Sequence, residues 1–202
     1  MNADVEKFVR FYDNEFGKEV MEREAKYVYD ELRNCSRILD VGCGIGVFEQ
    51  YLPSLHIIGL DISEELLEEA RRRSDKTFVQ GDAENLLFDD STFDAVFTVT
   101  TLEFLDDYEK AVREIARVTK PDGKILVMML NPKSEYFREE TEKPGAYFKR
   151  IKHTNPKEIR DYISQFYTLI KEEYFLGIKG KRIFDTDKEE NASLYVVVGL
   201  RK

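Results

Sequence analysis

The chain has 202 residues, with 31 Lys and Arg against 40 Asp and Glu, and its net charge of −9 argues against bulk electrostatic binding to nucleic acid or to an anionic membrane. Two cysteines are too few for a disulfide framework or a cysteine-based zinc site. The longest apolar run, residues 125–130, is too short to span a bilayer and the first residues carry no secretory signal pattern, so we expect a single-domain cytoplasmic protein.

Residues 1–34 have a helical pattern and are rich in aromatic side chains. Two interpretations stay open for Tyr12 and Phe16 in this segment. Either these side chains pack against the rest of the domain, or they cover a ligand as part of an N-terminal helical lid.

Five short apolar runs follow and alternate with helical patterns: residues 37–41, 57–60, 77–79, 94–99 and 124–130. Runs that are apolar throughout are typical of strands buried on both faces, as in a parallel sheet covered by helices. Ser63 is a suitable N-cap for one intervening helix, and Asp106 or Asp107 for another. The alternation predicts an α/β fold with a doubly wound, mostly parallel sheet, right-handed crossovers and helices on both faces.

The remaining segments depart from this repeat. Residues 132–156 mix charges with aromatic side chains, and we expect them to form an insertion that covers a substrate. A helix near 156–166 and two late strands follow. The predicted parts of the domain are a lid (1–34), a ligand-binding core (35–131), the insertion (132–156) and a C-terminal helix with two strands (157–202).

The most informative segment runs from Asp40 to Gly46, where glycines occupy every second position from 42 onward. It leaves the first strand and enters a helix, so its backbone can approach a ligand beside the positive end of that helix. Asp61 ends the second apolar run, and Asp82 follows the third. Because the carboxyl ends of parallel strands share one sheet edge, these residues converge on one crevice, where Asp61 can accept both hydroxyls of a ribose.

The spacing of the glycines narrows the choice of nucleoside ligand. A dinucleotide-binding loop requires G-x-G-x-x-G, and here the third glycine, Gly46, comes one position early. A phosphate-binding P-loop motif is absent from the sequence. Asp40 would repel a pyrophosphate, whereas it suits a ligand that carries an ammonium group.

These segments resemble the class I S-adenosylmethionine-dependent methyltransferases, and the small-molecule, ubiquinone/menaquinone-biosynthesis-like branch is the most similar. The resemblance covers residues 36–130 and implies a seven-stranded sheet whose last strand is antiparallel. It also implies S-adenosylmethionine (SAM) as cofactor, S-adenosylhomocysteine (SAH) as product and no metal. The matching motifs are residues 38–46, 59–63, 81–86, 93–96, 102–105 and 116–124.

The resemblance assigns roles residue by residue. It implies that the loop Gly42-Cys43-Gly44 approaches the methionine part of SAM, with Asp40 near its ammonium group. Asp61, followed by Ile62, holds the ribose. Asp82 accepts from the adenine amino group, and Ala83 offers its backbone N–H to the ring. Four further residues complete the expected cofactor-binding set: Tyr12, Glu84, Thr98 and Leu102.

A base is needed only if the methyl acceptor must lose a proton. Glu103 follows the fourth strand, where the chain of the family passes the transferable methyl, and it stands where His is frequent. Glu103 is therefore either a base or a solvated helix-end acid. His153 in the insertion is either a base or an ordinary loop histidine.

The predicted function is methyl transfer from SAM to a small organic acceptor. The alternatives are a SAM-binding scaffold or regulatory subunit without turnover, an enzyme that methylates RNA or protein, and a nicotinamide enzyme, which the glycine spacing disfavours. The sequence identifies neither the acceptor nor the oligomeric state. Only a basic cluster supports RNA or another anionic substrate: Lys149, Arg150, Lys152, Lys157 and Arg160.

Overall fold

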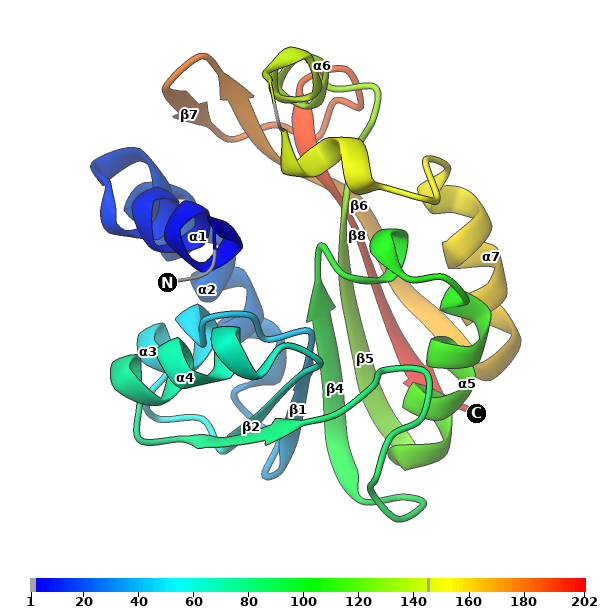
Figure 1. The fold of residues 1–202 in the computed structure, drawn as a ribbon. Coiled ribbons are helices and arrows are strands. Elements are labelled where there is room, and N and C mark those ends of the chain that lie inside the picture. The colour runs from blue at the N-terminus through cyan, green and yellow to red at the C-terminus, as the bar shows by residue number, and fades with distance from the viewer. Residues whose placement is uncertain (1–2, 145) are drawn as a thin grey trace.

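The structure is a computed structural model that describes residues 3–144 and 146–202, and its centre is a mixed eight-stranded sheet (Figure 1). The strand order is β3-β2-β1-β4-β5-β8-β6-β7. The strands β1 to β5 run parallel to one another, and β8 lies between β5 and β6 and is antiparallel to both. The bounds are β1 Ile38–Val41, β2 Ile57–Asp61, β3 Thr77–Gln80, β4 Phe93–Val99, β5 Thr119–Leu130, β6 Tyr167–Lys179, β7 Arg182–Phe184 and β8 Ala192–Arg201.

This sheet confirms the predicted doubly wound, mostly parallel fold with an antiparallel last strand. It has one strand more than expected, because the short strand β7 forms a hairpin with the end of β6 at the sheet edge. Gly180 makes the turn of this hairpin with a φ of +59°, a conformation that glycine adopts readily.

Seven α-helices and two short 3₁₀ helices surround the sheet in the described part of the chain (Figure 1). The helices α2 and α3 pack on one face of the sheet, and α5 and α7 pack on the other. Ser63 and Asp107 cap α4 and α5, each accepting from a backbone N–H three residues later. The bounds are α1 Ala3–Asp13, α2 Glu15–Leu32, α3 Val47–Tyr51, α4 Glu64–Arg73, η1 Leu102–Phe104, α5 Tyr108–Val118, α6 Glu135–Glu142, η2 Tyr147–Arg150 and α7 Pro156–Phe166.

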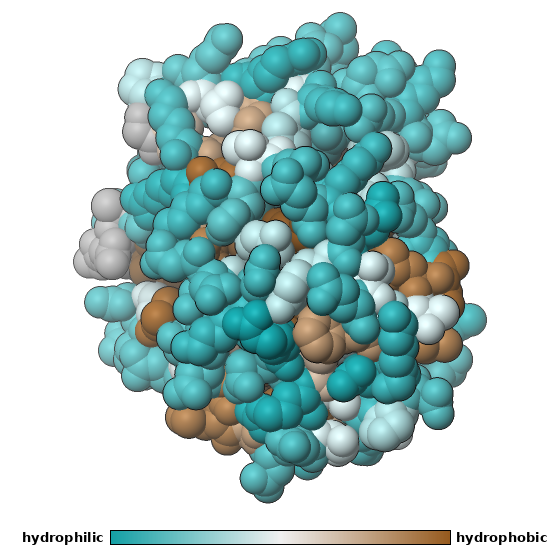
Figure 2. Space-filling view, turned by 90° about the vertical axis from the view of Figure 1, so that its right-hand side faces the viewer, coloured by the Kyte–Doolittle hydropathy of each residue, from teal (hydrophilic) through white to brown (hydrophobic). Residues whose placement is uncertain are grey.

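The charged residues of the chain cover its outside. The face that carries α5 and α7 is mostly hydrophilic, and its apolar patches are separated by polar side chains (Figure 2). Ion pairs between exposed side chains contribute about 0–1 kcal/mol each to the free energy of unfolding. The hydrophobic core therefore supplies most of the stability. Across residues 3–144 and 146–202, none of the helices combines the length and the apolar character that a membrane crossing requires.

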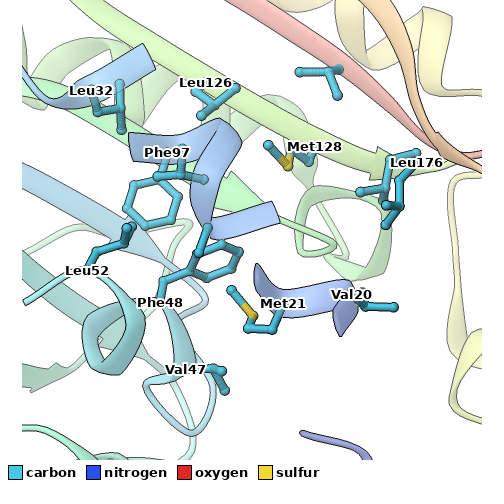
Figure 3. Close-up of a cluster of buried hydrophobic side chains, with 14 of the residues drawn as sticks. Val20, Met21, Leu32, Val47, Phe48, Leu52, Phe97, Leu126, Met128 and Leu176 are labelled. Carbon is cyan, nitrogen blue, oxygen red and sulfur yellow. The ribbon is translucent and has the colours of Figure 1, made fainter. Parts of the chain in front are cut away.

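The central strands are buried on both faces, as their continuous apolar sequence predicts. Along β5, Leu126 and Met128 face the α2 side, whereas Ile125, Val127 and Met129 face the α5 and α7 side. Figure 3 shows the α2 side, where side chains from α2, α3 and three strands meet. Residues of α2 are therefore part of the hydrophobic core, and α2 packs on one face of the sheet as α5 and α7 pack on the other.

Candidate functional site

The first cavity lies along the carboxyl ends of the parallel strands and has a volume of about 330 Å³. We call it the strand-end cavity. The loop after β1, the end of β2 and the turn after β3 all contribute to its lining, as the sheet topology predicts. Most of the predicted cofactor contacts line it together: Tyr12, Asp40, Gly42, Cys43, Gly44, Asp61, Ile62, Asp82 and Ala83.

The glycine loop has the left-handed conformation that its sequence predicts, with φ values of +81° at Gly42 and +55° at Gly44. A Cβ at Gly42 would lie 2.3 Å from the hydroxyl oxygen of Thr101, so a side chain there would collide with the chain after β4. A Cβ at Gly44 would meet no atom within 4 Å. The missing side chain of Gly44 thus leaves space in the cavity wall, and a ligand there can approach the backbone closely.

Asp61 ties the end of β2 to the glycine loop. Its Oδ2 accepts a hydrogen bond of 2.9 Å from the backbone N of Gly44, and its Oδ1 accepts one of 2.9 Å from Ser63 N. Burial raises the pKa of this carboxyl above its ordinary value, and the two N–H donors oppose that rise. A carboxylate held in this way keeps further acceptor capacity for two hydroxyl groups of a ligand.

Asp82 and Ala83 form a turn directly after β3. Asp82 Oδ1 accepts from the backbone N of Glu84 at 2.8 Å, and Asp82 O accepts from Asn85 N at 3.0 Å. This turn presents Asp82 and Ala83 to the strand-end cavity, at a different point of the rim from Asp61. The arrangement fits the predicted contacts with a heterocyclic base.

Asp40 at the floor of the cavity has a buried acidic neighbour, Glu49 on α3. Each is only 1% exposed, and in the part of the chain that the structure describes neither Asp40 Oδ2 nor either carboxyl oxygen of Glu49 has a hydrogen-bond partner. Burial and the nearby Glu49 raise the pKa of Asp40 well above its ordinary value, and burial raises the pKa of Glu49 to about 7. Two such acids retain a proton between them until a cation arrives. The unpartnered Oδ2 atom is therefore suited to an ammonium group.

A second cavity, of about 260 Å³, adjoins the first. We call it the aromatic cavity, because side chains from α1, η1, α6 and η2 surround it. One acid from α2, Glu24, lies in its wall, among aliphatic residues of β4, β5, β6 and β8. The two cavities share six lining residues: Phe8, Tyr12, Val99, Thr100, Phe104 and Tyr147.

The shared wall is held together by contacts between the N-terminal helices and the insertion. The ring of Tyr147 lies 5.2 Å from that of Phe8 and 4.9 Å from that of Phe104. Nearby, Arg150 donates to both carboxyl oxygens of Asp4 at 2.7 and 3.0 Å. Segments 1–34 and 132–156 thus meet over the strand ends, although their role as lids stays a prediction.

The structure places both predicted bases outside the residues that line the two cavities, so a role as base stays a prediction for each. Glu103 is 3% exposed, and its Oε1 accepts from the backbone N of Leu130 at 2.9 Å, so it connects η1 to the end of β5. Burial raises its pKa to about 7. The Nε2 atom of His153 lies 3.0 Å from Leu105 O, and its ring packs against Tyr108. The Glu103 side chain thus holds the end of β5, the His153 side chain holds the insertion to the chain after η1, and neither residue lines a cavity.

Three predicted cofactor contacts also lie outside the strand-end cavity. Glu84 Oε1 accepts from the backbone N of Asp107 at 3.0 Å and so positions the start of α5. Leu102 is fully buried in the core under α5 and α7, on the opposite side of the sheet from α2. Thr98 is buried within β4. The motif match alone does not show that Leu102 points into the far layer, that Thr98 is buried in the sheet, or that Glu84 bonds to the start of α5.

Two residues of the site are missing from the sequence prediction, Glu24 and Glu49. Glu24 had a signal, because Val20, Glu24 and Val28 share one helical stripe that is otherwise apolar. A charged residue within such a stripe is buried. Glu49 had no comparable signal, because α3 is too short to show a helical pattern of apolar residues.

The basic cluster of the insertion is largely neutralised by acids of the same chain. Arg150 pairs with Asp4, Lys152 with Asp106, and Arg160 with Glu172 and Asp161. Lys157 lies 4.0 Å from Glu189. Within residues 3–144 and 146–202 there is no group of three or more His, Cys, Asp or Glu side chains placed to hold a metal ion.

A family model described as a methyltransferase domain matches residues 39–127. Demethylmenaquinone methyltransferase of Thermotoga maritima is 36% identical over 104 residues, which are 49% of this chain and 45% of the relative. Malonyl-[acyl-carrier protein] O-methyltransferase of Erwinia pyrifoliae is 37% identical over 100 residues, 48% of this chain and 38% of the relative. The chain thus spans less than half the length of these two curated relatives.

A solved structure extends the similarity to almost the whole chain. It is a SAM-dependent methyltransferase of Thermotoga maritima, described as a possible histamine N-methyltransferase. It is 26% identical to this chain, with a TM-score of 0.81, and the match covers 98% of this chain and 96% of the solved one. The segments outside the family model, including the N-terminal helices and the insertion, therefore have counterparts in a known structure.

Proposed function

Because the chain belongs to the class I SAM-dependent methyltransferases, we propose that it transfers a methyl group from SAM to a small organic acceptor. The observation that carries the proposal is the pair of adjoining cavities, one at the strand ends and one lined by aromatic side chains. We also propose that the protein works in the cytoplasm. The acceptor is a small molecule and not a nucleic acid.

The residues of the strand-end cavity fit SAM. Asp40 has an unpartnered, buried oxygen for the ammonium group, and Gly44 leaves the space that its missing Cβ would fill. We assign the ribose to Asp61, and the adenine ring to Asp82 and Ala83. When bound, SAM supplies a methyl group on a positively charged sulfur, ready for in-line displacement. The protein then contributes orientation and exclusion of water, which can lower the barrier by up to about 7–11 kcal/mol.

The aromatic cavity favours an enzyme over a SAM-binding scaffold without turnover. A scaffold needs no second cavity beside the cofactor, whereas an acceptor must reach the methyl group from somewhere. Val99 and Thr100 at the end of β4 line both cavities, so this is the point at which acceptor and cofactor would meet. With Glu103 and His153 outside the cavities, we assign neither of them the role of base.

The alternative of RNA or protein methylation loses support with the ion pairs of the basic cluster, since paired cations attract a polyanion weakly. The two curated relatives are named for malonyl-[acyl-carrier protein] and for demethylmenaquinone, and the solved relative is described as a possible histamine N-methyltransferase. Oxygen, carbon and nitrogen acceptors therefore all belong in a substrate screen.

Isothermal titration calorimetry tests the cofactor assignment. We expect SAM and SAH each to bind with one site per chain, and NAD to show no binding. Binding of NAD without binding of SAM would contradict the proposal. Incubation of the SAM-loaded protein with small-molecule mixtures, followed by assay of SAH, then separates an enzyme from a scaffold. A scaffold would form no SAH above the blank with any mixture.

A further inference from the structure

We propose that the aromatic cavity binds a small amine in its ammonium form, with the carboxylate of Glu24 as its counter-ion. The inference deepens the proposed function and rests on it, since it gives the methyl acceptor a chemical class. Glu24 would hold the nitrogen, and the aromatic and aliphatic walls would enclose an apolar body. The reacting nitrogen would then be the atom that Glu24 keeps within the cavity.

The position of Glu24 is the first support. It lies on the buried stripe of α2, is 8% exposed, and contributes to the wall of the aromatic cavity. Through the described residues, no hydrogen bond or ion pair reaches its carboxyl group. A buried carboxylate without a partner is costly to retain, so such a group in a cavity wall indicates a missing cationic or donor ligand.

The other buried acids of the described residues are placed differently, although Asp40 Oδ2, Glu103 Oε2 and both carboxyl oxygens of Glu49 also lack a hydrogen-bond partner. Asp61 accepts from Gly44 and Ser63, and Glu103 accepts from Leu130. Asp40 and Glu49 face each other, and Asp40 opens onto the strand-end cavity, where the cofactor provides a cation. Glu49 and Glu103 line neither cavity, so among these buried acids of the described residues Glu24 is the one that faces the aromatic cavity.

The aromatic side chains are the second support. Seven of the lining residues are aromatic, and the faces of such rings attract cations, by about 0.5–2 kcal/mol for each favourable contact. An ammonium group can therefore be attracted both by these rings and by the Glu24 carboxylate. The aromatic lining residues are Phe8, Phe11, Tyr12, Phe104, Tyr136, Tyr147 and Phe148.

Among the described residues, the other charged groups that line the cavity have partners of their own. From α1, Asp4 pairs with Arg150, and Lys7 lies 3.9 Å from Asp4. From α6, Glu140 pairs with Lys143. Three phenols also face the cavity, namely Tyr12 from α1, Tyr136 from α6 and Tyr147 from η2. Burial raises the pKa of each phenol above its ordinary value, so the phenols stay neutral.

The protonation of Glu24 suits an amine that must become a nucleophile. Burial raises its pKa to about 8, which approaches the range of alkylamines. Glu24 can therefore take one proton from the bound ammonium. The N–H bond breaks, the O–H bond of the carboxylic acid forms, and the electron pair stays on the nitrogen. The proton acceptor that the sequence assigned to Glu103 or His153 is then a residue of the N-terminal helices.

Binding measurements test the inference without requiring turnover. The probes are 2-phenylethylamine, benzylamine and n-butylamine, each compared with its alcohol analogue, titrated into the full chain with and without saturating SAH. We expect at least one amine to bind about tenfold or more tightly than its alcohol. Glu24→Gln should remove that preference. Glu22→Gln, an exposed acid on the same helix, is the matched control and should retain it.

A proton count adds a readout that a merely structural role would not change. In the wild type, titrations in buffers of different ionisation enthalpy near pH 7 should show release of about one proton as the ammonium ionises Glu24, and in Glu24→Gln none. Equal binding of amines and alcohols, or full amine binding by Glu24→Gln, would overturn the inference. SAH binding is a separate titration, so failure of SAH to bind would instead overturn the proposed function.

Discussion

The strand-end cavity and the aromatic cavity share a wall, yet different parts of the chain build them. The first is made of short turns directly after strands, and its polar atoms are held by backbone hydrogen bonds, as at Asp61. The second is made of side chains from helices that precede and follow the central motif, and its one unpartnered acid, Glu24, has no backbone donor. We therefore expect a substitution in one cavity to change ligand binding there and to leave ligand binding in the other cavity unchanged.

The difference reflects what each cavity must recognise. A cofactor with fixed chemistry can be bound by backbone geometry, which many sequences with the same turns reproduce. An acceptor that varies between enzymes must be recognised by side chains, and these come from segments that can change without altering the sheet. The two cavities meet at shared lining residues that include Phe8, Tyr12 and Tyr147.

The largest expected effect is the pH dependence that Glu24 gives to stability. Its pKa is raised from 4.5 to about 8 in the folded state, so the folded protein binds more protons than the unfolded chain between these values. Stability should therefore fall as the pH rises through this range and level off above it. Relative to Glu24→Gln, the wild type should lose about 2–4 kcal/mol between pH 5 and pH 9.

Urea unfolding of both proteins across this pH range measures the difference directly. Burial also raises the pKa values of Asp40, Glu49 and Glu103. Their contributions to the pH dependence of stability are present in both proteins and cancel in the comparison with Glu24→Gln. If the free energies of unfolding of the two proteins changed with pH in parallel, Glu24 would already have a partner in solution. The acceptor assignment would then lose its main support.

Asp61→Ala should have the next largest effect, and only on the strand-end cavity. It removes the assigned ribose contact and the acceptor for Gly44 N and Ser63 N, so SAM affinity should fall by about 1–3 kcal/mol. Calorimetric titration with SAM measures the loss. Binding of the amine probes without SAH should remain within about a factor of two. Unchanged SAM affinity would refute the ribose assignment.

Asp82→Ala should weaken SAM binding less, by about 0.5–1.5 kcal/mol, because the backbone N–H of Ala83 remains. The substitution also removes the acceptor for the backbone N–H of Glu84. This hydrogen bond is exposed, so water can take the place of the lost carboxylate. The same titration compares the two variants under identical conditions. A larger loss than for Asp61→Ala would count against placing the base beside Asp82.

Glu103→Gln should have the smallest effect. The amide oxygen can still accept from Leu130 N, and the residue lines neither cavity, so SAM affinity and amine binding should each change by less than about twofold. Both titrations are simple to repeat on this variant. A tenfold change in either would return Glu103 to the site.

The fold was predictable because its signals are local. Continuous apolar runs give the buried strands, and Ser63 and Asp107 give helix starts that the structure confirms. The extra strand β7 was not predictable, since Arg182–Phe184 is too short to show a pattern. Eight of the nine predicted residues along the strand-end cavity follow from sheet topology, which brings strand ends together; the ninth, Tyr12, comes from α1.

The acceptor side was less predictable for a physical reason. Glu84 and Glu103 are polar residues that follow strands, and His153 is a polar residue of the insertion, but chain position does not fix the direction of a side chain in a loop. Each instead bonds to a backbone atom of a neighbouring segment. Glu24 was identifiable only by its place in an apolar stripe, and the cavity that it faces forms only when α2 and the insertion come together.

The central claim is that one adenosyl ligand lies along the strand ends and leaves the aromatic cavity free for an acceptor. A crystal structure of the protein with SAH tests it most directly. The account predicts the ribose at Asp61, the adenine at Asp82 and Ala83, and the amino group at Asp40, with the sulfur facing the wall formed by Tyr12 and Thr100. Density for SAH within the aromatic cavity, or a ribose that does not contact Asp61, would contradict it.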